Sequence, residues 1–184
     1  MNQPVQASFG DQLNFVRAQP AQLGLYLNFL EEIATWLHAC DIAQWRPGDF
    51  RLAADYYAQS IANGEVWLAY GQAELVGTLR ILPAEPIVWP EMQVEDAVYV
   101  NTVAVRRDWA HAGVGSALLA WADRVAHCFD CEYLRLDCMA DNAFLCGYYA
   151  QAGFVSRGEV DAQFPAPVGT LRLQRFERMV PCDL

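Results

Sequence analysis

Hydrophobic positions in the first third of the chain recur at every third or fourth residue. This period is that of an amphipathic α-helix, and it predicts a long helix from about Pro20 to Cys40. The positions that keep the period are Leu23, Leu27, Leu30, Ile33, Ala34 and Leu37. Further helices are predicted over residues 50–62, 114–128 and 142–152, which makes four in all.

Runs of β-branched and aromatic residues predict seven β-strands. They cover residues 12–18, 66–70, 74–82, 97–105, 133–138, 154–160 and 169–180. Residues 83–96 hold three prolines and four acidic residues, which indicates a loop before the apolar strand 97–105. Because no repeat or linker is visible, we expect residues 1–184 to form a single α+β domain around a mixed sheet.

The charged residues of the chain exclude several classes of function. The 184 residues carry 12 basic and 22 acidic side chains, a net charge of −10, and every basic residue is an arginine. Without lysine, the chain cannot form Schiff bases or supply a Walker lysine. The sequence pI near 4.6 argues against binding to nucleic acid or to anionic membranes, and it suits a cationic partner.

The N-terminal residues show no basic cluster followed by an apolar run, and no stretch is apolar enough for a membrane helix, so we expect a cytoplasmic protein. Of the six cysteines, only Cys128 and Cys131 have a C-x-x-C spacing. A structural zinc site would need a second pair. We therefore expect no metal and no obligatory disulfide, and a zinc or thiol protein built on this pair is the third-ranked hypothesis.

Two glycines, Gly113 and Gly115, stand where the predicted helix 114–128 begins, after strand 97–105. Helix N-termini present unpaired N–H groups and a positive dipole end, and glycines allow a phosphate to approach closely. The pair indicates either an anion site or only a tight turn. A Walker loop is excluded because no G-K-S/T is present, and a Rossmann loop would need three glycines after the first strand.

In this context the segment Ala110–Ser116 resembles the pyrophosphate motif R/Q-x-x-G-x-G of the GNAT superfamily, the acetyl-CoA-dependent N-acyltransferases. Asn142 at a helix start and Tyr149 four residues before Gly153-Phe154 resemble a second motif of that family. The order of elements fits over about residues 12–180. The resemblance implies a three-layer fold with a central, mostly antiparallel sheet of about seven strands flanked by four helices.

The resemblance also implies a site for acetyl-CoA as co-substrate. It assigns to this site Val103, Ala104, Val105, Ala110, His111, Ala112, Gly113, Val114, Gly115, Ser116, Asn142 and Tyr149. The pantetheine arm would pair with Val103–Val105, the Val103 N–H would stabilise the oxyanion, and Tyr149 would protonate the leaving thiolate. Tyr148, about 100° away on the helix, is expected in the core or at the rim.

One motif position departs from the family pattern, because Ala110 stands where Arg or Gln is usual. Backbone N–H groups would still hold the phosphates, and His111 or the pair Arg106 and Arg107 would add positive charge.

The general base stays open among several candidates. Many family members carry a glutamate on the fourth strand, where this chain has Tyr99 and Asn101. Glu95 and Asp96 at the start of that strand, a water relay through Asn101, or an amine that arrives partly deprotonated would each suffice. Asp137 on the next strand is expected to be structural. The catalytic candidates are thus Tyr149, Asn101 and Glu95.

The leading hypothesis is an N-acetyltransferase that moves the acetyl group of acetyl-CoA to a primary amine of a small molecule or peptide. The alternative is a catalytically weak or inactive acyl-CoA-binding module, because of Ala110 and the missing strand glutamate. Aromatic and acidic residues on the first two helices and the two late loops suit a cationic amine. They are Glu31, Glu32, Trp36, Trp45, Asp49, Asp55, Tyr56, Tyr57, Glu85, Trp89 and Glu91. A homodimer and a monomer both stay open.

Overall fold

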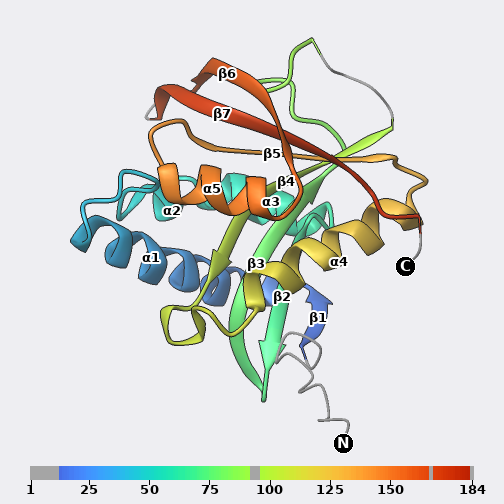
Figure 1. The fold of residues 1–184 in the computed structure, drawn as a ribbon. Helices are drawn as coiled ribbons and strands as arrows, with labels where there is room; N and C mark the ends of the chain where they lie inside the picture. Colours follow the sequence, from blue (N-terminus) through green and yellow to red (C-terminus); the bar gives the residue numbers. More distant parts are fainter. Residues whose placement is uncertain (1–12, 92–95, 166–167, 183–184) are drawn as a thin grey trace, which may run out of the picture.

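The computed structural model describes residues 13–91, 96–165 and 168–182. They form one seven-stranded sheet in the order β1-β2-β3-β4-β5-β7-β6 (Figure 1). The strands are β1 Asn14–Arg17, β2 Val66–Gly71, β3 Glu74–Leu82, β4 Ala97–Val105, β5 Tyr133–Met139, β6 Val155–Phe164 and β7 Gly169–Met179. Neighbouring strands are antiparallel except β4 and β5, which run parallel. The predicted α+β class and mostly antiparallel sheet are confirmed.

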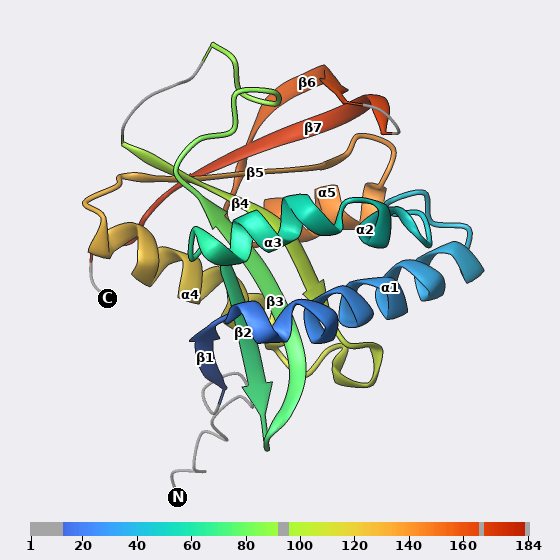
Figure 2. The same ribbon diagram turned by 180° about the vertical axis from the view of Figure 1, so that it is seen from behind.

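Helices cover both faces of the sheet. They are α1 Leu23–Ala39, α2 Asp49–Leu52, α3 Ala54–Ala62, α4 Val114–Cys128 and α5 Ala143–Gln151, with 3-10 turns at Pro20–Gln22 and Arg107–Trp109. The helices α1, α2 and α3 lie on one face (Figure 2), and α4 and α5 lie on the other (Figure 1). The result is the expected three-layer arrangement.

The predicted helix over residues 50–62 was wrong in one respect. It is divided into α2 and α3 at Ala53, whose φ of −97° and ψ of 21° leave the helical region. The carboxylate of Glu31 on α1 accepts hydrogen bonds from the backbone N–H groups of Gly48 and Arg51, which ties α2 to α1. The described residues therefore contain five α-helices instead of the four predicted.

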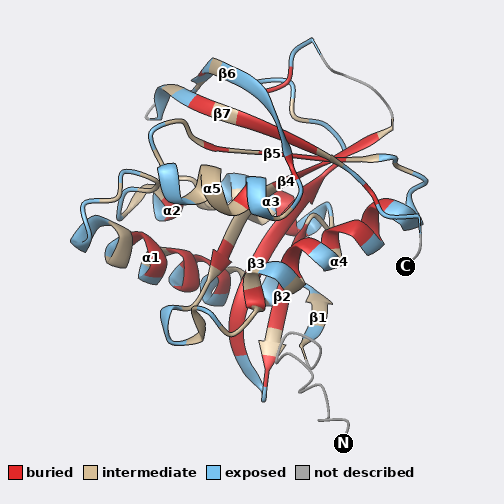
Figure 3. Cartoon of the chain, in the orientation of Figure 1, coloured by how far each residue is buried: buried red, intermediate tan, exposed pale blue. Residues whose placement is uncertain are grey.

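The strand predicted over residues 154–160 is also longer than expected. β6 continues to Phe164, because residues 160–164 pair with residues 169–173 of β7 in a hairpin. Buried side chains lie along the strands and on the inner stripes of α1 and α4 (Figure 3). One core cluster lies between the sheet and α4 with α5, and a second lies between the sheet and α1 with α3.

The strands β4 and β5 separate part-way along their length. They pair only from Ala97–Val100 to Tyr133–Leu136. Further on, β4 continues against β3, whereas β5 continues against β7. Between the pairs Arg80↔Asn101 and Thr78↔Ala104, β3 advances by two residues and β4 by three, so β4 contains a β-bulge. Within the described chain, residues 101–105 of β4 thus have no strand partner on the β5 side.

Candidate active site

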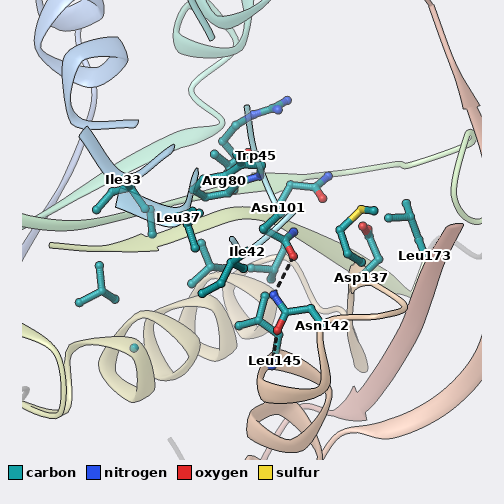
Figure 4. Close-up of a pocket in the computed structure, with 18 of the residues that line it drawn as sticks. Ile33, Leu37, Ile42, Trp45, Arg80, Asn101, Asp137, Asn142, Leu145 and Leu173 are labelled. Carbon is teal, nitrogen blue, oxygen red and sulfur yellow. Dashed lines mark hydrogen bonds between the residues drawn. The ribbon is translucent and has the colours of Figure 1, made fainter. Parts of the chain in front are cut away.

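A cavity of about 1150 Å³ opens where β4 and β5 separate. It is larger than the ~300–1,000 Å³ usual for a small-ligand pocket, so it has room for a long co-substrate and an acceptor together. Its walls come from α1, α3, β3, β4, the start of α4, β5 and α5. The lining is mostly apolar, with a few polar groups that converge on the gap between the two strands (Figure 4).

The N-terminus of α4 lies at one end of this cavity. Gly113 caps the helix with a φ of 83°, and His111 also has a positive φ of 65°. The first-turn N–H groups of a helix have no partner within it, and the dipole there favours an anion. The predicted phosphate residues that line the cavity are Ala110, His111, Gly113, Val114, Gly115 and Ser116. Ala112 does not line the cavity but packs against the core cluster.

The free edge of β4 lies between this helix start and the centre of the cavity. Val103, Ala104 and Val105 all line the cavity, as does Asn101. The bulge places Thr102 at a φ of 52°, which is rare for a β-branched residue. An extended ligand arm can pair with unpartnered backbone groups at such an edge, in the manner of an added strand.

Helix α5 contributes Asn142 and Tyr149. The Asn142 side chain accepts a hydrogen bond from the backbone N–H of Leu145 (3.0 Å), as an N-cap does, and its amide donates to Oε1 of Gln44 (3.2 Å; Figure 4). Tyr149 lines the cavity although it is only 5% exposed, and its ring packs against Phe154 and Phe176. Burial raises the pKa of Tyr149, so its hydroxyl stays protonated at neutral pH.

Two carboxyl groups face the middle of the cavity. Asn101 of β4 donates a hydrogen bond from Nδ2 to Oε2 of Glu85 (2.9 Å), and Asp137 of β5 lies across the gap from Asn101 (Figure 4). Burial, reinforced by the charge of Glu85, raises the pKa of Asp137 to about 7. Burial also raises the pKa of Glu85, against the lowering effect of the Asn101 hydrogen bond. A carboxyl group poised in this way accepts a proton at neutral pH.

A sequence model described as the acetyltransferase (GNAT) family matches residues 30–154, more than half of the chain. The chain belongs to this family. Its enzyme class is that of an acyltransferase, and acetyl-CoA is the co-substrate that the family uses.

Known proteins agree with this assignment. The uncharacterized N-acetyltransferase YesJ of Bacillus subtilis (strain 168) is 31% identical over 103 residues, which are 54% of this chain and 57% of YesJ. The match therefore spans little more than half of that relative. An acetyltransferase of the GNAT family from Listeria monocytogenes has a TM-score of 0.74 at 19% identity, covering 91% of this chain and 94% of its own. The putative acetyltransferase yncA from Salmonella typhimurium, solved with acetyl-CoA, has a TM-score of 0.65 at 15% identity over 94% and 96% of the two chains.

The structure of this GNAT chain places some of the candidate bases in the cavity and others elsewhere. Asn101 lies in the site, whereas Glu95 falls outside the described residues. Tyr99 points away from the cavity, because its hydroxyl accepts a hydrogen bond from Nη1 of Arg135 (2.9 Å). Asp137, expected to be structural, instead lines the cavity. Its place on β5 between Leu136 and Cys138, both buried, was a signal that the strand exposes its polar face to a site.

The basic residues near the phosphate end differ in availability. Arg106 forms ion pairs with Glu74 and with Glu32, the latter at 3.6 Å, and it does not line the cavity. Arg107 does line it, with its guanidinium 4.6 Å from the ring centre of Trp36. Of the three basic residues expected beside the phosphates, Arg107 and His111 line the cavity and Arg106 does not.

Most of the residues expected around the acceptor do line the cavity. They are Trp36, Trp45, Asp49, Asp55, Tyr56, Tyr57 and Glu85. Trp89 is instead fully buried, and Glu91 forms an ion pair with Arg175, so neither is available to an acceptor.

In the described ranges, no group of three or more His, Cys, Asp or Glu side chains is arranged to hold a metal ion, so the cysteines belong to no such group. Cys128 is exposed, and the Cys131 thiol donates a weak hydrogen bond to the carbonyl of Phe129 (3.7 Å). Within the same ranges, no helix combines the length and the apolar character that crossing a membrane requires.

The helix start yields a first prediction. Gly113→Val and Gly115→Val should each abolish binding of CoA, measured by calorimetry. At Gly113 a branched side chain meets a φ of 83°, and at Gly115 a Cβ would lie 2.7 Å from the Tyr148 hydroxyl. Gly24→Val, on an open surface of α1, is the matched control and should bind CoA like the wild type. Undiminished CoA affinity in both α4 variants would disprove this phosphate site.

Proposed function

We propose that this chain transfers the acetyl group of acetyl-CoA to a primary amine of a small molecule or peptide, by direct attack of the amine on the thioester. One observation carries the proposal. A single cavity holds a helix N-terminus for an anion, an unpaired strand edge, a protonated tyrosine and a carboxyl group with a pKa near neutrality.

The residues fit acetyl-CoA along the length of the cavity. The first turn of α4 would hold the pyrophosphate, and the backbone of Val103–Val105 would pair with the pantetheine arm. Bound there, the co-substrate supplies an activated acyl carbon. The Val103 N–H is the proposed donor to the oxyanion.

Two side chains would carry the proton transfers, and a third would position a neighbouring carboxylate. Asp137 takes a proton from the attacking amine as the carbon–nitrogen bond forms, either directly or through a water. Asn101 holds the Glu85 carboxylate beside it, and this neighbouring charge helps keep the Asp137 pKa high. Tyr149 gives its proton to the sulfur as the carbon–sulfur bond breaks. One amine proton thus reaches Asp137, and the departing CoA thiol carries away the proton of Tyr149. Proton exchange with solvent then returns both side chains to their starting states.

Aromatic rings and carboxylates around the acceptor end support a cationic amine as the acceptor. Trp45 offers an aromatic ring, and Asp49 and Asp55 line the same cavity. An ammonium group would be attracted there and would then lose its proton near Asp137.

Ala110 supports one alternative, a module that binds acyl-CoA without turning it over, because the motif there lacks its usual Arg or Gln. A panel of primary amines, assayed by thiol release from acetyl-CoA, separates the two functions. We expect amine-dependent release well above the hydrolysis rate. CoA binding with no amine-dependent release for any member of the panel would favour the binding module.

A further inference from the structure

Arg80 of β3 is a buried charge that belongs to the acceptor end of the cavity. It is 3% exposed, yet it lines the cavity beside Asn101, its pairing partner on β4 (Figure 4). Burying a guanidinium is costly unless its donors are satisfied. Arg135, another buried arginine, donates hydrogen bonds to both Glu177 and Tyr99, whereas the Nε of the buried Arg175 has no partner among the described residues.

The donors of Arg80 are only partly used. Its Nη2 donates to the Tyr56 hydroxyl (2.9 Å) and lies 3.7 Å from the carboxylate of Glu65. Its Nε is buried and has no hydrogen-bond partner among the described residues. A guanidinium has five N–H donors in a planar fork, so this one retains capacity for a further acceptor.

Aromatic rings hold this guanidinium in position. Its central carbon lies 4.7 Å from the ring centre of Tyr56 and 5.5 Å from that of Tyr57. Rings stacked in this way fix the plane of the fork without using its N–H groups. The side chain is therefore preorganised, and a carboxylate or a phosphate would make the strongest hydrogen bonds to its remaining donors.

The carboxyl groups that would face the amine belong to β5 and to the loop after β3. Arg80 is on β3 and Asp137 on β5, with β4 between them, and both line the cavity. Glu85 lies between them, close enough to Arg80 that the guanidinium lowers its pKa, although burial raises it more. The acceptor end is thus basic on one side and acidic on the other.

We infer that the acceptor is an amine that also carries a carboxylate, such as an amino acid. The fork of Arg80 and the Tyr56 hydroxyl bind the carboxylate, while Asp137 and Glu85 face the amino group. This inference rests on the proposed acetyl transfer and adds the substrate class. The apolar walls around the pair, among them Val88 and Leu173, accommodate an aliphatic body between or beside the two charges.

Matched pairs of acceptors test the inference by turnover. L-leucine is compared with 3-methylbutylamine, and 4-aminobutyrate with propylamine, so that each pair differs only by the carboxylate. In the wild type the carboxylated member of at least one pair should have a KM about 10–100-fold lower, as expected for a charge-assisted bidentate contact. Equal KM values within both pairs would overturn the inference.

Two variants assign the effect to this site. Arg80→Lys keeps the charge but loses the fork, and Tyr56→Phe removes one hydroxyl from a side chain that is 54% exposed. Both should reduce the KM ratio within a pair, which a loss of fold or of catalysis alone would not do. Arg172→Lys, at an exposed position of β7 outside the cavity, is the matched control and should keep the wild-type ratio. A ratio that survives in both site variants contradicts the assignment.

Calorimetry separates this inference from the proposed function. Leucine is titrated into protein saturated with CoA, so the readout needs no turnover. Binding to the wild type that is weakened at least 10-fold in Tyr56→Phe supports the carboxylate site even if no amine releases thiol. Absence of leucine and 4-aminobutyrate binding at millimolar concentration overturns the carboxylate site, whether or not other amines are acetylated.

Discussion

Replacing Tyr149 by phenylalanine should lower kcat by about 10²–10⁴-fold, the range expected when a general acid is lost. The hydroxyl faces the cavity, whereas the ring packs on Phe154 and Phe176 and still does so in the variant. Folding and CoA affinity should therefore hardly change. KM should also hardly change, because the proton is needed mainly in the transition state. Steady-state kinetics with thiol detection measures the split.

Tyr148 is a poor control for this experiment, because it also lines the cavity and its hydroxyl lies against Gly115. Tyr133 is better matched, since it is a half-buried tyrosine of β5 outside the cavity. Tyr133→Phe should retain the wild-type kcat. If Tyr149→Phe also retains it, the thiolate obtains its proton from water or from another group.

The elements themselves were largely predictable from local patterns. The helix that became α4 combines a 3.6-residue apolar period with a glycine that adopts a positive φ at its cap, and both signals lie within a few neighbouring residues. The N-cap of α5 is an equally local signal, because the Asn142 side chain accepts a hydrogen bond from a backbone N–H only three residues further on. Two features escaped because they depend on distant residues: the division of the second helix at Ala53, where Glu31 of another helix binds α2, and the extension of β6, which pairs with β7.

The catalytic centre was less predictable, because it depends on where β4 leaves β5. The bulge at Thr102 has no glycine to mark it, and the cavity forms only when the two halves of the sheet diverge. A signal for Arg80 was nevertheless present. An arginine inside the apolar strand 74–82 is unusual, since charged residues are seldom fully buried without a partner. The position of Glu85 depends on a loop, whose place no local pattern encodes.

Asp137 was misjudged for the same reason. In β5 the alternation places Asp137 on the opposite face of the strand from the buried Leu136 and Cys138. Because the pairing with β4 stops at Val100, Asp137 borders the gap between the two strands and lines the cavity. A carboxyl group that looked structural in the sequence therefore lines the cavity, and it is the group that we propose as the base.

Asp137→Asn is accordingly expected to lower kcat/KM by about 10²–10⁴-fold at pH 8. In the wild type, kcat/KM should rise with pH through about 7, because the base works only when it is deprotonated. In the variant this rise should be lost, and the remaining activity should follow deprotonation of the amine alone. The exposed Asp161→Asn is the matched control and should keep both the rate and the pH profile.

Stability measured against pH tests the same carboxyl group without any substrate. The folded-state pKa of about 7 exceeds the reference value of ~3.9 for an unfolded aspartate, so the folded protein binds the extra proton between these values. The contribution of Asp137 to stability is fully present below the unfolded pKa and is lost as the pH rises through the folded pKa. An asparagine cannot ionise, and it relieves the repulsion from Glu85 at high pH. The Tm of Asp137→Asn should therefore exceed that of the wild type by more at pH 8 than at pH 5. If the variant loses activity but its Tm falls equally at both pH values, the carboxyl group supports the fold, and the base must be sought elsewhere.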